Sequence, residues 1–308
     1  IAHTPVKSIR GLSVVTDSVL WASGTGGMVG RSTDGGVHWR WAQVPGCDSC
    51  DWRSLYAFDA DKAFVLNAGA PAFIFFTGDG GHSWEQVFYD NRPGVFFDAL
   101  QFFDEQSGIA VGDPLGDKFM VIRTHNGGRS WEADNEAALP AAAAGEAIFA
   151  ASGTSLVALP GKHIYFATGG AVARLFTGGT NWKAYTIPAV QGSGSTGIFS
   201  IAFLDAQRGV AVGGDYKQDT ARNGNCLLTV NGGRSWYAPA TPPGGYRSCV
   251  AYITPQLLIA TGTSGTDISA DGGKNWQPAG SGFNVAAKAR KGNKVYLAGK
   301  DIAELIRR

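Results

Sequence analysis

Short apolar runs bounded by glycine-rich turns follow one another along the whole chain. Phe73-Ile74-Phe75-Phe76 and Met120-Val121-Ile122 are typical, and each run has the length of a buried strand. No segment sustains the periodicity of an amphipathic helix. The pattern therefore predicts an all-β chain with almost no helix.

One turn sequence recurs between these runs. Its first copy is Ser32-Thr33-Asp34-Gly35-Gly36-Val37-His38-Trp39, and the same order of hydroxyl residue, acid or amide, two glycines and tryptophan returns downstream. A degenerate copy that ends at Trp182 has Leu175 in place of the hydroxyl residue and Thr177 in place of the acid. The motif tryptophans are residues 39, 84, 131, 182, 236 and 276, so they lie 45, 47, 51, 54 and 40 residues apart. This is the period of a four-stranded propeller blade.

The chemistry of the repeat is that of a tight turn. An Asp or Asn side chain accepts hydrogen bonds from backbone N–H groups, and glycines adopt positive φ without a Cβ clash. The motif resembles the Asp-box, or bacterial neuraminidase repeat. That resemblance implies a structural hairpin away from the working face, so we expect purely structural roles for Asp34, Asp79, Asn126, Asn231 and Asp271.

The apolar runs predict seven blades. The inner strands are expected at residues 11–15, 54–58, 99–103, 148–152, 200–203, 250–253 and 285–289. Because only six motifs accompany seven inner strands, the blade formed by residues 285–306 lacks its outer strand. Thr4-Pro5-Val6, just before the first inner strand, is placed to supply it and to remove an exposed edge. The expected fold is one domain, residues 1–308: a seven-bladed β-propeller of four-stranded blades, closed by an N-terminal strand.

Composition narrows the partners and the compartment. The 26 basic and 25 acidic residues nearly cancel, so a nucleic-acid partner is not expected. No apolar run approaches the ~20 residues that a transmembrane helix needs. The chain begins at Ile1 without a methionine, which fits either a removed signal peptide or a trimmed chain. With an even number of cysteines, we expect a secreted or periplasmic protein with two disulfides, Cys47–Cys50 and Cys226–Cys249.

In this topology the loops that join the second and third strands of a blade share one face, here called the loop face, with the connections between blades. Unpatterned charged and aromatic residues gather there, and the expected binding residues are Arg10, Trp52, Arg53, Asp98, Tyr216, Tyr246 and Arg247. Arg10, Arg53 and Arg247 each precede an inner strand. They converge near the channel mouth, or each pairs with a neighbouring acid and joins adjacent blades.

A second constellation on the loop face consists of acids. Asp98, Asp113, Glu146 and Asp215 would supply the two carboxylates that glycoside hydrolysis requires, with Trp52, Tyr216 or Tyr246 stacking on a sugar. Each acid also fits ordinary turn chemistry. The arginine motif Phe/Tyr-Arg-Ile-Pro of sialidases is absent, because the nearest segment is Ser8-Ile9-Arg10-Gly11. No metal site and no cofactor are expected, since histidine clusters and phosphate-binding glycine motifs are missing.

Across essentially its whole length the chain is similar to the Ycf48-type propellers, the photosystem II stability and assembly factors. The similarity rests on the repeated turns and on the strands before them, such as Gly108-Ile109-Ala110-Val111-Gly112 and Gly209-Val210-Ala211-Val212-Gly213. It implies a seven-bladed propeller outside the cytoplasm that binds another protein. The first hypothesis is therefore a non-catalytic, monomeric binding protein with a protein partner. The alternative is a glycosidase or carbohydrate-binding propeller, which a deep cleft with paired acids and exposed aromatic residues would favour.

Overall fold

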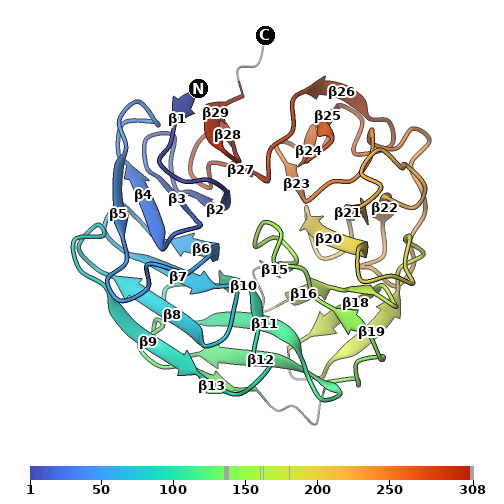
Figure 1. Cartoon of the computed structure of the whole chain (residues 1–308). Helices are drawn as coiled ribbons and strands as arrows, with labels where there is room; N and C mark the ends of the chain where they lie inside the picture. The colour runs from blue at the N-terminus through green and yellow to red at the C-terminus, as the bar shows by residue number, and fades with distance from the viewer. Residues whose placement is uncertain (135–138, 160, 162, 180, 306–308) are drawn as a thin grey trace.

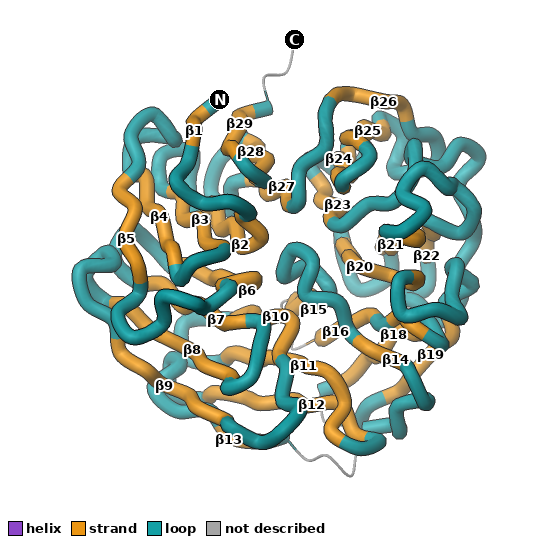
Figure 2. The backbone as a smooth tube through the Cα atoms, in the orientation of Figure 1, coloured by secondary structure: helices purple, strands orange, loops and turns teal. Residues whose placement is uncertain are grey.

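Seven antiparallel sheets follow one another around a ring (Figure 1). This computed structural model describes residues 1–134, 139–159, 161, 163–179 and 181–305. The described residues form strands, turns and loops only (Figure 2). The predicted all-β, seven-bladed propeller is confirmed.

The blades follow in chain order. Blade 1 consists of β2 (Ile9–Val14), β3 (Leu20–Gly24), β4 (Met28–Ser32) and β5 (Arg40–Gln43). Blade 2 consists of β6 (Trp52–Ala57), β7 (Ala63–Asn67), β8 (Ala72–Thr77) and β9 (Glu85–Asp90). Blade 3 consists of β10 (Phe97–Phe102), β11 (Gly108–Leu115), β12 (Lys118–Thr124) and β13 (Glu132–Ala133). Blade 4 consists of β15 (Leu156–Leu159), β16 (His163–Ala167), β18 (Arg174–Gly178) and β19 (Lys183–Thr186).

The later blades are less regular. Blade 5 consists of β20 (Thr196–Phe203), β21 (Gly209–Asp215), β22 (Cys226–Thr229) and an outer bridge from Tyr237 to Leu228. Its inner edge is extended by β17 (Gly169–Gly170) and β14 (Glu146–Ala147). Blade 6 consists of β23 (Cys249–Tyr252), β24 (Leu258–Gly262), β25 (Gly265–Ser269) and β26 (Gln277–Gly280). Blade 7 consists of β27 (Val285–Lys288), β28 (Val295–Ala298), β29 (Asp301–Glu304) and β1 (Ala2–His3).

The N-terminal segment closes the ring, with a register that differs from the prediction. Ala2 pairs with Ile302 and His3 with Asp301, whereas Thr4-Pro5-Val6 was expected to form the strand. Pro5 has no N–H to donate to a ladder, and Val6 instead lies buried in the core. Of the blade expected over residues 285–306, the third strand, β29, ends at Glu304, and Ile306 lies outside the described residues.

The Asp-box turns have the predicted chemistry. In blade 1 the backbone N–H of His38 donates to Asp34 Oδ1 (2.9 Å), and the N–H of Gly36 donates to Ser32 Oγ (2.9 Å). Gly35 and Gly36 have φ values of 76° and 83°, which favour glycine. The hydrogen bond from the His38 N–H is the main cause that lowers the pKa of Asp34 to about 2. A carboxylate committed in this way to its own turn is structural.

Blade 4 departs from the repeat in two ways. In a blade with an intact Asp-box, the hydroxyl residue of the motif pairs with a residue of the second strand; in blade 1, Ser32 pairs with Leu20. In blade 4 the corresponding residue of the second strand, Ile164, pairs with Gly178. Gly178 thus occupies the hydroxyl position, which was assigned to Leu175, and Thr180 of this turn lies outside the described residues. The prediction that residues 148–152 form the inner strand of blade 4 is also wrong. The inner strand is β15, and residues 148–155 before it are irregular.

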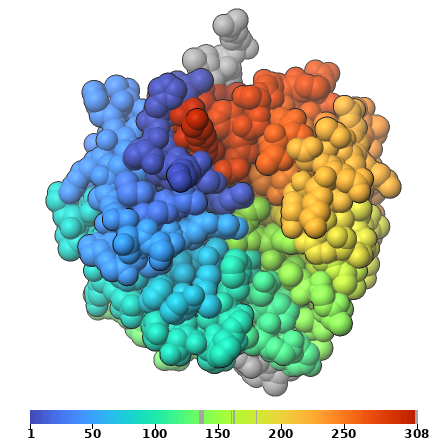
Figure 3. Space-filling model, viewed as in Figure 1, coloured from blue at the N-terminus to red at the C-terminus, as the bar shows by residue number. Residues whose placement is uncertain are grey.

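The hydrophobic core is divided into layers between neighbouring blades. Trp21 and Trp52 lie in the layer between blades 1 and 2, and Phe119 and Phe166 lie in the layer between blades 3 and 4. In the space-filling view, segments distant in sequence meet at the middle of the disc (Figure 3). The blades therefore pack against one another in a ring that positions the loop face.

Candidate functional site

Residues 148–155, here called the central loop, cross the centre of the ring before β15 (Figure 1). Arg10 Nη1 of blade 1 donates to the Ala151 carbonyl (2.8 Å). Ser152 Oγ donates to the Ser248 carbonyl of blade 6 (2.7 Å), and the Ile201 N–H of blade 5 donates to the Thr154 carbonyl (2.9 Å). The central loop thus joins several blades and forms a floor within the channel.

A cavity of about 390 Å³, here called the central pocket, lies against this loop. Its lining is cationic and aromatic: Arg10, Arg53, Phe149, Ala150, Ala151, Phe199, Tyr216, Tyr246, Ser248, Thr263 and Asn284. Four of the seven predicted binding residues therefore come together, namely Arg10, Arg53, Tyr216 and Tyr246.

The aromatic wall is an ordered cluster. Phe149 stacks on Phe199 with ring centroids 3.8 Å apart, and Tyr246 meets Phe199 edge-on at 4.8 Å. Tyr216 completes the cluster at 6.0 Å from Phe199 and remains 47 % exposed. Burial raises the pKa of Tyr246, so its hydroxyl stays protonated at neutral pH. The wall offers flat apolar surface with a hydroxyl donor beside it.

The two arginines supply positive charge. Arg53 Nε donates to Asp51 Oδ2 (2.7 Å), so this arginine is paired, as one reading of the sequence predicted. Within the described part of the chain, Arg10 has no carboxylate at ion-pair distance and donates only to Ala151. Burial, and then the charge of Arg53, lower the pKa of Arg10. The pocket thus has two guanidinium groups but only the Asp51 carboxylate to pair with them, which favours an anionic ligand.

Arg247 does not join them; of the two alternatives that the sequence left open for the arginines, pairing with an acid is the one that it follows. Its side chain is buried and ion-paired with Asp267, and Nη1 donates to Ser264 Oγ (2.7 Å). A planar guanidinium satisfies several acceptors at once, so this pair fastens β25 of blade 6 to the segment that precedes β23. Trp52 is also buried and packs near Phe75, and it is therefore not placed to stack on a ligand.

Asp98 and Asp113 lie close enough to interact, but neither lines the central pocket. Asp98 is 1 % exposed, and neither carboxylate oxygen receives a hydrogen bond of normal geometry. Burial and the nearby Asp113 raise its pKa well above the usual value, and Arg53 opposes the rise. Burial raises the pKa of Asp113 to about 6, although its Oδ1 accepts a hydrogen bond from the Ile148 N–H (2.8 Å).

The other two candidate acids have structural partners. Glu146 is ion-paired with Arg174 and accepts a hydrogen bond from Thr168 Oγ1 (2.6 Å). Asp215 accepts the Lys217 N–H (2.9 Å) in a turn. None of the four acids lines the central pocket. The central pocket therefore has an exposed aromatic residue, as a sugar-binding site would, but it lacks the pair of carboxylates that a glycosidase needs.

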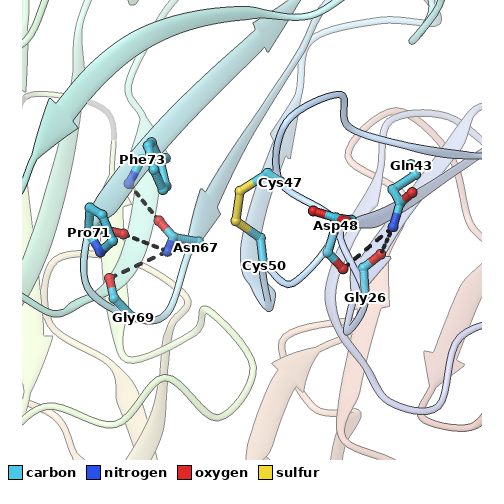
Figure 4. The surroundings of a disulfide bond; sticks show 9 residues. All are labelled: Gly26, Gln43, Cys47, Asp48, Cys50, Asn67, Gly69, Pro71 and Phe73. Atoms are coloured by element: carbon cyan, nitrogen blue, oxygen red, sulfur yellow. Dashed lines mark hydrogen bonds between the residues drawn. A yellow bond between two sulfur atoms is a disulfide. The ribbon is translucent and has the colours of Figure 1, made fainter.

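One of the two predicted disulfides is present. Cys47 is bonded to Cys50 in the loop before β6, beside the turn stabilised by the Asn67 side chain (Figure 4). Cys226 and Cys249 are free thiols, so the second bridge was wrong. Because neighbouring strand residues point to opposite faces, Val250 packs in the layer that contains Cys226, whereas Cys249 packs toward blade 7.

Sequence reasoning missed Phe149 and the carbonyls of the central loop. Phe149 belongs to an apolar run that matches the strand pattern, and no local signal marks it as a pocket residue. The pairing of Arg10 with Ala151 joins residues far apart in the sequence.

Fold and site together define an Asp-box β-propeller that presents a cationic, aromatic pocket on its loop face. The profile described as "Photosynthesis system II assembly factor YCF48" matches residues 7–293. The chain belongs to this family.

A curated relative is the photosystem II assembly lipoprotein Ycf48 of Synechococcus sp. (strain CC9902). It is 28% identical over 149 residues, which cover 47% of this chain and 41% of the relative. The matched stretch is thus less than half the length of that relative.

Solved structures support the same fold. The structure of YCF48 bound to D1 peptide has a TM-score of 0.70 at 16% identity and covers 99% of this chain and 96% of that one. YCF48 from Cyanidioschyzon merolae has a TM-score of 0.68 at 18% identity, with 98% and 97% covered. U3-55K has a TM-score of 0.65 at 14% identity, with 96% and 94% covered. Likeness at these identities shows the fold alone.

The described residues contain no helix that is long and apolar enough to span a membrane.

Proposed function

We propose that this protein is a non-catalytic assembly factor that binds a peptide segment of a photosystem II subunit in the central pocket. A carboxylate of that segment lies between Arg10 and Arg53, and an apolar side chain packs on the aromatic wall. Membership of the family and the D1 peptide bound to one structurally similar YCF48 support this proposal.

The incomplete charge compensation of Arg10 is the observation that carries the proposal. A partly buried cation without a paired carboxylate is costly, and a ligand carboxylate would offset that cost. The neighbouring Arg53 already holds Asp51 on one edge, so the carboxylate would meet two guanidinium groups. Charge-assisted hydrogen bonds of this kind are about twice as strong as neutral ones.

An exported location is part of the same proposal. The Cys47–Cys50 disulfide is typical of oxidising compartments, and the Synechococcus relative is named a lipoprotein.

Binding of fluorescein-labelled, overlapping D1 peptides tests the proposal by fluorescence anisotropy. Each peptide is made with the acidic groups intact and with them replaced by amides. We expect at least one peptide to bind in its acidic form, and Arg10→Ala to weaken that binding about 10- to 100-fold, as the loss of ~1.5–3 kcal/mol of charged hydrogen bonding implies. The matched control is Arg129→Ala, which removes an exposed arginine from an Asp-box turn.

Three outcomes would contradict the proposal. The first is that no peptide binds. The second is that amide forms bind as tightly as acidic forms. The third is that Arg10→Ala and Arg53→Ala leave the affinity unchanged. Circular dichroism of each variant shows whether the fold is intact.

A further inference from the structure

A second cavity on the loop face lies between blade 3 and the connection that follows it in the chain. It has a volume of about 550 Å³ and is bounded by the hairpin that joins β11 to β12 and by residues 142–147. This cavity, here called the outer groove, is lined by Gly94, Asp113, Pro114, Gly116, Asp117, Ala142, Ala143, Ala144, Gly145, Glu146 and Ala147. Most of these residues have little or no side chain, so the backbone of a guest segment can approach closely.

The charged residues that line the outer groove are all acidic. Glu146 is neutralised by Arg174, which leaves Asp113 and Asp117. Asp113 accepts a hydrogen bond from a backbone N–H, and no cation among the described residues forms an ion pair with either aspartate. The nearest lysine in the chain, Lys118, donates to the Leu139 carbonyl instead (3.2 Å). The groove therefore offers two carboxylates without a cationic partner.

The outer groove and the central pocket border the same stretch of backbone. Ala147 lines the groove, while Phe149 and Ala150 line the pocket, so one stretch of backbone borders both. An extended chain rises about 3.3–3.6 Å per residue, and three residues span roughly 10 Å. A single extended ligand of that length would reach from one cavity to the other.

We propose that the outer groove is a second subsite, which takes a lysine or arginine side chain of the same partner segment whose carboxylate occupies the central pocket. The proposal rests on the proposed function and deepens it. The spacing places the basic residue about two to four residues from the carboxylate. The protein would then recognise a segment that carries both charges, with its carboxylate beside Arg10 and its lysine or arginine side chain beside Asp113 and Asp117.

Opposite charges in separate cavities would also fix the direction of the bound segment. A reversed segment would place its cation beside Arg10 and Arg53, and like charges brought together in this way oppose binding.

The test uses the D1 peptide that binds most tightly in its acidic form, labelled with fluorescein. Lysine is placed at each position near the carboxylate in turn, and each version is compared with glutamine at the same position. We expect lysine at one position to strengthen binding about tenfold. Asp117→Asn and Asp113→Asn should each reduce that preference, and the double variant should abolish it.

Asp215→Asn is the matched control, because it removes a loop-face carboxylate that lines neither cavity. Asn at position 113 keeps an oxygen that can accept the Ile148 N–H, and Asp117 is exposed in a hairpin turn, so both variants should fold.

The subsite is refuted if no position prefers lysine, or if the preference survives in the double variant. Binding that still depends on the carboxylate would in that case leave the proposed function standing. If no acidic peptide binds, or if binding ignores the carboxylate, the proposed function and the subsite fail together.

Discussion

Replacing Asp113 with asparagine should stabilise the protein at neutral pH. Burial raises the pKa of Asp113 from 3.8 to about 6, so the folded state favours the protonated carboxyl more than the unfolded state does. By linkage, the stability of the parent falls as the pH rises from about 4 to about 6, because the folded state binds more protons over that interval. The full loss of stability is present above the folded-state pKa of about 6, and it is absent below the unfolded-state pKa of 3.8.

The rise of about 2 in pKa corresponds to about 3 kcal/mol in the free energy of unfolding, at 1.36 kcal/mol for each unit. Asparagine has nearly the same shape, keeps an acceptor for the Ile148 N–H and carries no charge. The stabilisation of Asp113→Asn over the parent should therefore be near zero around pH 4 and approach about 3 kcal/mol above pH 7.

Urea denaturation of parent and variant at a series of pH values measures this difference directly. Asp215→Asn, in which the lost carboxylate accepts a backbone N–H in a turn, serves as the control for removing a charge from the loop face. A stability difference that does not change with pH, or that falls as the pH rises, would refute the reasoning.

Three further predictions concern the fold. Deleting residues 1–8 should lower the melting temperature strongly, because β29 loses its outer partner, β1, and Val6 is removed from the core; a truncated chain that melts like the parent in calorimetry would contradict the closure. Thiol labelling of the unfolded, unreduced protein followed by peptide mapping should modify Cys226 and Cys249 only, and a peptide that links them would show that the assignment is wrong. Asp267→Asn should cost about 3–5 kcal/mol of stability in urea denaturation, because Arg247 is left as a buried charge without a counter-ion, and a loss below about 1 kcal/mol would show that the charge finds another partner.

The overall fold could be predicted from the sequence because its information is local. Each Asp-box contains its own turn chemistry within a few residues, and the repeat period sets the size of the blade. The closing strand was assigned to the correct segment but displaced, because Ala2 and His3 have no apolar pattern of their own. Their pairing depends on the opposite edge of blade 7, which local patterns do not describe.

The grouping of residues at the candidate site could be predicted in part. Arg10, Arg53, Tyr216 and Tyr246 line one cavity, as expected, because topology alone places their loops on one face. Trp52 was misplaced because side chains alternate along β6, and the sequence does not say which of two adjacent residues faces the pocket.

Blade 4 shows a different limit. Residues 148–152 and residues 156–159 are both short apolar runs, and periodicity cannot choose between them. The choice is made by distant partners: Arg10, Ser200 and Ser248 hold the central loop in the channel, which leaves β15 to form the inner strand. The loop that forms the floor of the pocket is therefore specified by the completed ring rather than by its own sequence.

Asp113 joins stability to recognition, and two of the experiments above separate these roles. A carboxyl group buried beside Asp98 has a cost that asparagine would remove, so selection for stability alone would favour its loss. If Asp113→Asn is more stable and has also lost the preference for lysine, the acid is retained at the expense of stability because it binds a cation. If the variant is more stable and the preference is unchanged, the cost has no part in recognition, and Asp117 alone would have to carry the charge of the outer groove.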